Sequence, residues 1–176
     1  MSTTVDLEKL PETVQSPMIE EFLSQLKEVA STGDEKSFSH IIAFAQANDD
    51  ISFESNLTEQ GSTTLMILAA MGRHDLINVL LKEPSCPAVD QVNSNGTTAL
   101  VFACSTGNFS CVRVLCEAGA NVNWAIGSLD TPMMVAAEEG FDEIVSYLCT
   151  TQAADMEKKN DSGHTALLCA CNQVNG

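Results

Sequence analysis

Apolar residues recur at three- and four-residue steps near the start of the chain, which predicts two amphipathic helices. The first begins at Ser16-Pro17, where serine can act as the N-cap and proline as the first helical residue. A polar run, Ser31-Thr32-Gly33-Asp34, separates the two helices. Residues 1–15 are polar and lack such a period, so we expect a disordered leader there. The two apolar stripes are Met18, Ile19, Phe22, Leu23, Leu26, Val29 and Ala30, and then Phe38, Ile41, Ile42 and Ala45.

Beyond this helix pair, one short pattern returns at a nearly constant interval. A threonine appears four times, with spacings of 35, 33 and 34 residues, and a glycine follows each of the first three threonines by nine residues. Self-similarity at a period of this size indicates a repeat array. The threonines are Thr63, Thr98, Thr131 and Thr165, and the glycines are Gly72, Gly107 and Gly140.

Each of the three fuller copies predicts a pair of helices. Small apolar residues follow the threonine, and bulkier apolar residues follow the glycine. Small side chains let neighbouring repeats approach closely, so we expect the first helices inside and the second helices in an outer, convex layer. The run Pro84-Ser85-Cys86-Pro87 is an insertion in the first copy, and its prolines predict a local bulge. The fourth copy opens at Gly163-His164-Thr165 and lacks a second helix, which suggests the N-terminal piece of something longer.

These residues resemble ankyrin repeats. The strongest copy runs from Asn95-Gly96-Thr97-Thr98-Ala99-Leu100 to Asn121-Val122-Asn123. The resemblance implies an all-α solenoid of stacked helix-turn-helix units with finger-like turns. In that fold the threonine hydroxyl caps the first helix, and the glycine ends it in a left-handed conformation. The expected units are a leader (1–15), an N-terminal capping helix pair (16–56), three ankyrin repeats (57–92, 93–125 and 126–159) and a truncated repeat (160–176).

The net charge narrows the classes of partner. The chain has a formal charge of −16 and only eight Lys and Arg residues, which argues against nucleic acid and against anionic membrane surfaces. A protein with a basic surface would instead be steered toward it. No apolar stretch approaches the ~20 residues of a membrane helix, and the N-terminus lacks a signal-peptide pattern. Seven cysteines without a secretory signal indicate a reducing compartment, the cytoplasm, with the nucleus as the alternative.

The side chains that could carry chemistry favour structural roles. The pairs Cys169-x-Cys171 and Cys111 with Cys116 do not have zinc-site spacing, so we interpret the cysteines as apolar core residues, with a metal or redox role as the alternative. In the repeat register Cys104 and Cys171 share one small-residue core position. His74 lies near a turn and is interpreted as structural. No nucleophile motif or carboxylate pair indicates catalysis, so we expect neither an enzyme, nor a cofactor, nor a metal site.

The ankyrin resemblance implies that partner proteins bind at the turn tips and at the exposed face of each first helix. We carried these family positions over residue by residue. The predicted contact residues are Glu59, Gln60, Ser62, Ser94, Asn95, Thr97, Ser105, Thr106, Ser128, Asp130, Glu138, Glu139, Asp161, Ser162 and His164.

Three of the candidate features have a functional and a structural interpretation. Glu138-Glu139 is either a solvated helix end or the recognition site for a Lys- or Arg-bearing partner. Trp124 is either an interface anchor or a residue that packs on the neighbouring finger. Asn123 matches the asparagine that is hydroxylated in some ankyrin repeats, and it is also the family's structural choice at that turn.

The function that follows is a protein–protein interaction module, an adaptor or scaffold that binds a partner on its concave face. One alternative is a targeting segment of a larger enzyme or channel whose active domain lies beyond Gly176. A second alternative is a structural spacer without a partner.

Overall fold

The computed structural model describes residues 17–46, 61–83, 86, 88–152 and 154–173. Among these residues there are nine α-helices and no strand. The predicted leader, residues Glu59 and Gln60, and most of the Pro84–Pro87 insertion lie outside the described residues. The helices are α1 (Pro17–Thr32), α2 (Glu35–Gln46), α3 (Thr64–Ala70), α4 (His74–Leu80), α5 (Ala99–Ser105), α6 (Phe109–Glu117), α7 (Pro132–Glu138), α8 (Asp142–Thr150) and α9 (Ala166–Gln173).

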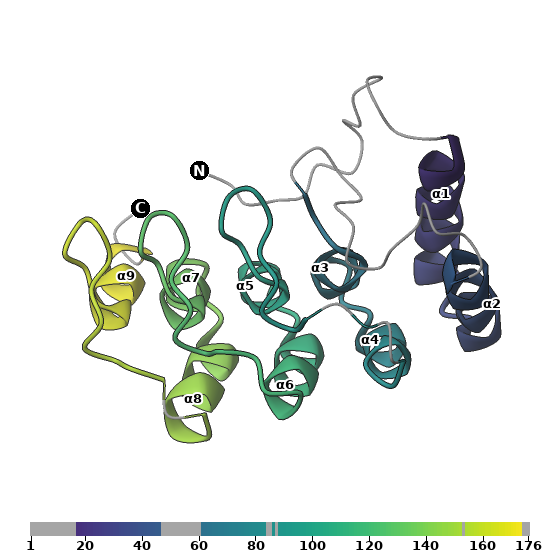
Figure 1. The fold of residues 1–176 in the computed structure, drawn as a ribbon. Helices are drawn as coiled ribbons and strands as arrows, with labels where there is room; N and C mark the ends of the chain where they lie inside the picture. Colours follow the sequence, from purple (N-terminus) through teal and green to yellow (C-terminus); the bar gives the residue numbers. More distant parts are fainter. Residues whose placement is uncertain (1–16, 47–60, 84–85, 87, 153, 174–176) are drawn as a thin grey trace.

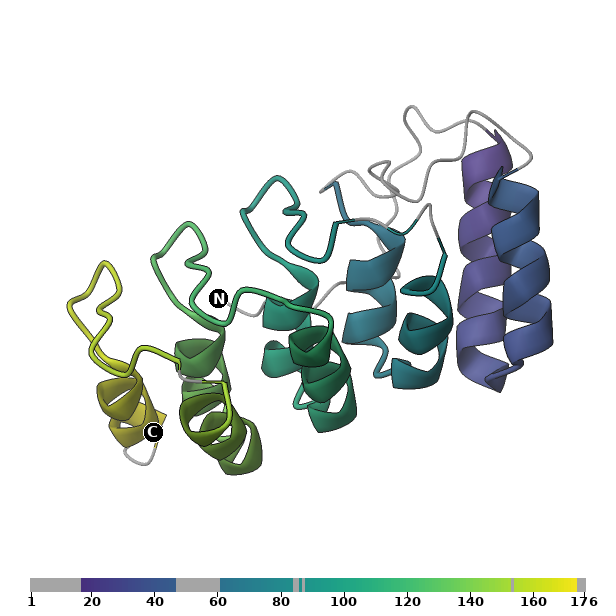
Figure 2. The same ribbon diagram turned by 60° about the horizontal axis from the view of Figure 1, so that its bottom comes forward.

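The helices form two stacked rows with the longer α1–α2 pair at one end (Figure 1). Helices α3, α5, α7 and α9 make one row, and each packs on the next. Helices α4, α6 and α8 make the second row, which continues from α2. Three finger-like loops project side by side beyond the first row, a relation that is also plain in Figure 2. The predicted all-α solenoid with finger-like turns is therefore confirmed.

Threonine and glycine mark the two ends of each first helix as predicted. The hydroxyl oxygens of Thr63, Thr98 and Thr131 accept hydrogen bonds from the backbone amides three residues later, at 3.3–3.4 Å. These bonds satisfy amides that have no partner within the helix. The glycines that follow α3, α5 and α7 have φ values of +74°, +72° and +78°. Glycine reaches this left-handed region without a Cβ clash, which explains its return in the first three copies.

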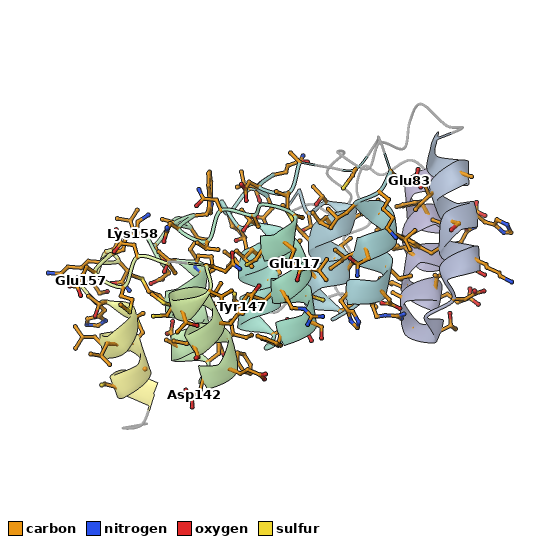
Figure 3. The ribbon with its side chains drawn as sticks, turned by 90° about the horizontal axis from the view of Figure 1, so that it is seen from below. Glu83, Glu117, Asp142, Tyr147, Glu157 and Lys158 are labelled. Carbon is orange, nitrogen blue, oxygen red and sulfur yellow. The ribbon has the colours of Figure 1, made fainter. Side chains whose placement is uncertain are left out.

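The core lies between the two rows. Nearly every side chain of α3, α5 and α7 is buried, because each of these helices packs on its neighbours in the row and on its own partner helix. The second helices bury one side only, such as Leu76, Ile77 and Leu80 of α4. The outer row also has an aromatic contact, since Phe109 of α6 and Tyr147 of α8 meet edge to face at 5.4 Å. Figure 3 shows Tyr147 together with Glu117 and Asp142 on this outer row.

One predicted core cysteine is exposed. Cys104, Cys111, Cys116 and Cys169 are buried, whereas Cys171 is exposed, so its assignment to the core was wrong. The reason is the side of α9 on which it lies. Leu167 on the same side is 74% exposed, although Leu100 at the equivalent position of α5 is 1% exposed. In α5 this side is covered by the following repeat, whereas among the described residues no helix packs on this side of α9.

Candidate partner-binding surface

Neighbouring fingers are joined by a repeating side-chain hydrogen bond. The Asp90 carboxylate accepts a hydrogen bond from the backbone amide of Asn121 at 2.8 Å, 31 residues later. The Asn123 side-chain oxygen accepts the equivalent bond from the backbone amide of Asp155, also at 2.8 Å. Asp90 and Asn123 both stand eight residues before the repeat threonine, so one sequence position makes both links.

Further bonds fix the fingers to one another nearer their tips. The Trp124 indole N–H donates to the Gly96 carbonyl of the preceding finger at 2.9 Å. The Asn160 side-chain amide donates to the Asp130 carboxylate at 2.7 Å. The backbone amide of Asp161 donates to the Ser128 carbonyl at 3.1 Å. Because each finger is bonded to its neighbour at several points, the three tips form one pre-organised surface.

The predicted contact residues divide by exposure into three groups. Ser94, Asn95, Ser128, Glu138, Glu139, Asp161 and Ser162 are exposed. Ser105, Thr106, Trp124, Asp130 and His164 are half-buried. Ser62 and Thr97, in contrast, are 1% and 4% exposed, so the structure contradicts their assignment to the contact surface.

Thr97 is buried because it closes the base of its finger. Its backbone amide donates to the Asn93 side chain at 2.9 Å, and its carbonyl accepts from the Asn93 backbone amide at 3.1 Å. Thr97 is therefore part of the closed base of the finger and does not belong to its exposed tip. Family position alone did not reveal this, but the amide-bearing Asn93 four residues earlier is a sequence signal for such a closed turn.

Several half-buried contact residues also hold the fold. The Asp130 carboxylate accepts from Asn160 and from the Ser128 hydroxyl, the latter at 2.6 Å. The Thr106 hydroxyl donates to the Phe102 carbonyl at 2.8 Å and accepts from the Asn108 amide at 2.7 Å. Substituting these residues would change the structure as well as the surface, whereas Glu138, Glu139 and Asp161 are exposed.

The acidic residues converge where α7 meets α9. Burial raises the pKa of the Cys169 thiol, and the nearby carboxylates of Asp130 and Glu138 raise it further. The carboxylates of Asp130, just before α7, and of Glu138, at its end, therefore both affect the Cys169 thiol of α9. With Glu139 at the end of α7 and Asp161 on the last finger, they give this end of the array a negative surface.

The buried thiols are poorly suited to chemistry. Burial raises the pKa of Cys104 far above its usual range, that of Cys111 to about 12 and that of Cys116 to about 11. The thiolate is the reactive and metal-binding form, so these thiols are inert near neutral pH. In the described part of the chain, no group of three or more His, Cys, Asp or Glu residues is placed to hold a metal ion.

Two features were not anticipated from the sequence. A groove of about 580 Å³ lies between α1 and α2, and none of the predicted contact residues lines it. Leu129, on a fingertip, is 47% exposed and has a φ of +60°. The positive φ of Leu129 could have been predicted from the repeat register, because the equivalent positions in the other copies are Gly61, Gly96 and Gly163. The groove is lined by Gln25, Glu28, Val29, Thr32, Asp34, Ser37, His40 and Ile41.

Comparison with known protein families agrees with this architecture. A family model for ankyrin repeats in three copies matches residues 26–125, and a model for a single ankyrin repeat matches residues 128–161. The chain belongs to the ankyrin repeat family. Ankyrin repeats are interaction modules that bind proteins and are generally not enzymes.

Individual relatives extend well beyond the region of similarity. The Drosophila melanogaster protein "Ankyrin repeat and KH domain-containing protein mask" is 36% identical over 108 residues, which are 60% of this chain and 3% of that protein. The rabbit (Oryctolagus cuniculus) "Ankyrin repeat, SAM and basic leucine zipper domain-containing protein 1" is 29% identical over 80% of this chain and 29% of its own length. The Arabidopsis thaliana "E3 ubiquitin-protein ligase KEG" is 27% identical over 93% of this chain and 10% of its own length. The chain thus spans less than a third of each of these relatives.

In the described residues, no helix is both long and apolar enough to cross a membrane.

Proposed function

We propose that this chain binds a partner protein across the surface made by the fingertips and the exposed ends of the first helices. The observation that carries the proposal is the hydrogen-bonded row of fingers, which holds exposed polar side chains in a fixed arrangement. A surface that is already ordered loses little conformational entropy when a partner binds. Ser94, Asn95, Ser128 and Asp161 supply the polar contacts on this surface.

The partner we propose has a basic surface. Glu138, Glu139 and Asp161 are exposed at the C-terminal end of the array, and the whole chain carries a charge of −16. Complementary charge raises the association rate and selects among partners. The same charge disfavours nucleic acid, whose binding depends on Lys and Arg contacts to phosphate. The buried, unpaired cysteines fit a reducing compartment, and we propose the cytoplasm or the nucleus.

We also propose Asn123 as a site of asparagine hydroxylation. Its support is the match to the family position, and its side chain is half-buried and linked to Asp155. An enzyme would therefore act on it when the finger opens. Mass spectrometry of the protein from hydroxylase-containing cells tests this, and a peptide without a +16 Da shift at Asn123 would contradict it.

A second candidate is a targeting segment of a larger enzyme. The observation in its favour is that 93% of this chain matches 10% of a ubiquitin ligase. In that case the repeats would still bind a protein, and the bound protein would be brought to an active domain elsewhere. Both candidate functions use the same binding surface, so one experiment tests that surface for both.

Affinity capture from cell lysate with quantitative mass spectrometry tests the proposed surface. The baits are the unchanged protein and the variant Glu138→Lys/Glu139→Lys, matched for thermal stability. The control variant Glu117→Lys/Asp142→Lys makes the same charge change on the outer row of helices (Figure 3). We expect a partner that is lost from the first variant and retained by the control. Equal capture by all three baits would contradict binding at the acidic end.

A further inference from the structure

Leu129 has a backbone conformation that its side chain disfavours. In the described residues it is the one non-glycine residue with a positive φ, at +60°. The equivalent fingertip residues Gly96 and Gly163 have φ values of +74° and +76°. Glycine adopts this region freely, whereas a bulky residue with a Cβ is strained there. The middle finger therefore has the same backbone shape as its two neighbours, with a leucine where they have glycine.

The surrounding finger imposes this conformation. The backbone amide of Leu129 donates to the Ile126 carbonyl at 2.7 Å, and the Ile126 amide donates to the Asp130 carbonyl at 3.0 Å. The Ser128 carbonyl next to it accepts from Asp161 of the following finger. A strained residue persists when its neighbours over-determine the backbone in this way. Leu129 is therefore held in one place by bonds on both sides.

Burial within the chain does not offset the strain. Leu129 is 47% exposed at the fingertip, so much of its apolar surface faces water. A glycine at this position would give the same turn without strain and without an exposed apolar side chain. Strained residues of this kind cluster where proteins bind their ligands.

We propose that Leu129 is an apolar anchor, which inserts into an apolar pocket on the partner protein. This inference rests on the proposed function and names one contact within it. The pocket is bordered by a Lys or Arg side chain, because the exposed Asp161 lies on the adjoining finger, whose backbone is bonded to Ser128. Because the Leu129 backbone is already fixed by its neighbours, little conformational entropy is lost when the side chain inserts.

The first test compares capture by the unchanged protein with capture by Leu129→Gly and Leu129→Met. Both variants keep the charge of the surface, and Leu129→Met keeps an apolar side chain of similar size. We expect at least about a tenfold loss of the retained partner with Leu129→Gly, which corresponds to 1.4 kcal/mol, and a smaller loss with Leu129→Met. Ser110→Gly, at an exposed position of α6 in the outer row of helices, is the control and should retain the partner.

The second test places the photo-crosslinking residue p-benzoylphenylalanine at position 129, with position 110 on α6 as the control. We expect a crosslink from position 129 to apolar residues of the partner that lie beside a Lys or Arg. A partner that is lost from Glu138→Lys/Glu139→Lys but retained by Leu129→Gly overturns the inference and leaves the proposed function in place. If the unchanged bait retains no protein above empty beads, the proposed function itself is contradicted, and this inference with it.

Discussion

The side-chain amide of Asn108 lies directly over Gly72 of the preceding repeat. It donates to the carbonyls of Ala69 and Ala70, at 3.3 and 3.4 Å, where α3 ends. A Cβ on Gly72 would lie 2.6 Å from the Asn108 side-chain oxygen. Glycine thus lets the asparagine reach these two carbonyls, of which that of Ala69 also accepts from the Gly72 amide at 3.2 Å. Arg73 and Phe141 stand at the same repeat position, and they lie over Gly33 and Gly107 respectively.

Replacing Asn108 with alanine is expected to lower the free energy of unfolding by about 0.5–1.5 kcal/mol, because the carbonyls of Ala69 and Ala70 lose this side-chain donor while that of Ala69 keeps its bond from the Gly72 amide. Urea unfolding followed by circular dichroism measures this loss. Asn95→Ala is the control, since Asn95 is exposed on a fingertip and its loss should change stability by less than about 0.5 kcal/mol. Equal effects of the two substitutions would show that the Asn108 bonds contribute nothing specific.

Gly107→Ala is expected to cost more than Gly119→Ala. Both glycines have positive φ, +72° and +88°, so each substitution pays about 1–2 kcal/mol for the left-handed backbone. At Gly107 the added Cβ would also lie 2.4 Å from the Phe141 ring, whereas at Gly119 nothing lies within 4 Å. The difference between the two thermal unfolding midpoints measures the contact with Phe141. Identical midpoints would mean that the ring moves aside without cost.

Leu129→Gly is expected to raise stability, which is unusual for the removal of an apolar side chain. Relief of the left-handed strain contributes about 1–2 kcal/mol, and the greater freedom of glycine in the unfolded chain offsets about 0.5–1 kcal/mol of it. Ser162→Gly should lack this gain, because Ser162 does not have a positive φ. Chemical unfolding of the three proteins side by side measures the effect, and a stability loss with Leu129→Gly would disprove the strain.

Acid should weaken the contact between Arg73 and Asp75. The hydrogen bond from Arg73 holds the pKa of the Asp75 carboxyl below its usual range. Its folded pKa is thus below the unfolded value of about 3.9. The Arg73–Asp75 pair contributes about 0.5–1 kcal/mol to the free energy of unfolding, the range for a partly exposed pair. This contribution is present above the unfolded pKa and is lost as the pH falls through the folded pKa. Below pH ~4 the free energy of unfolding should fall less steeply with decreasing pH for Asp75→Asn than for the unchanged protein. Unfolding curves measured over a series of pH values give this slope, and parallel slopes for the two proteins would refute the coupling.

The thiols should react in an order set by burial. Iodoacetamide at pH 8 is expected to modify Cys171 first, because it is exposed, and Cys104 and Cys111 last. Burial raises the pKa of Cys111 to about 12, so its thiol form is stabilised in the folded state. That stabilisation is present below the unfolded thiol pKa of about 8.5 and is lost as the pH rises through the folded value. Peptide mass spectrometry over time gives the order, and early labelling of Cys104 would contradict it.

Local sequence signals predicted the fold well because each repeat is built from short-range rules. Thr98 and Gly107 act within their own turn, and their roles follow from capping and from left-handed backbone geometry. The contacts between repeats were harder to predict. Arg73, Asn108 and Phe141 share a register position but no chemical property, so no residue pattern reveals that all three reach the preceding glycine.

The candidate surface was predictable only in outline. Glu138, Glu139 and Asp161 are exposed as the family positions imply. Thr97 is buried, because its exposure depends on how Asn93 closes the finger. Cys171 is exposed, because its burial depends on a neighbour outside its own repeat. Exposure at a repeat position is thus decided by the adjoining repeat as much as by the residue itself.

The three residues that lie over the glycines make chemically different joints between successive repeats. At Arg73 the guanidinium pairs with Asp75 of its own repeat and donates across the joint to the Ala30 carbonyl. The joint at Asn108 is a neutral amide, and the joint at Phe141 is an aromatic ring on a glycine. Acid protonates Asp75 and so removes the partner that orients the Arg73 guanidinium, whereas the contacts of Asn108 and Phe141 involve no titratable side chain. Of these three joints, the one between the α1–α2 pair and the following repeat is therefore the one whose strength depends on pH.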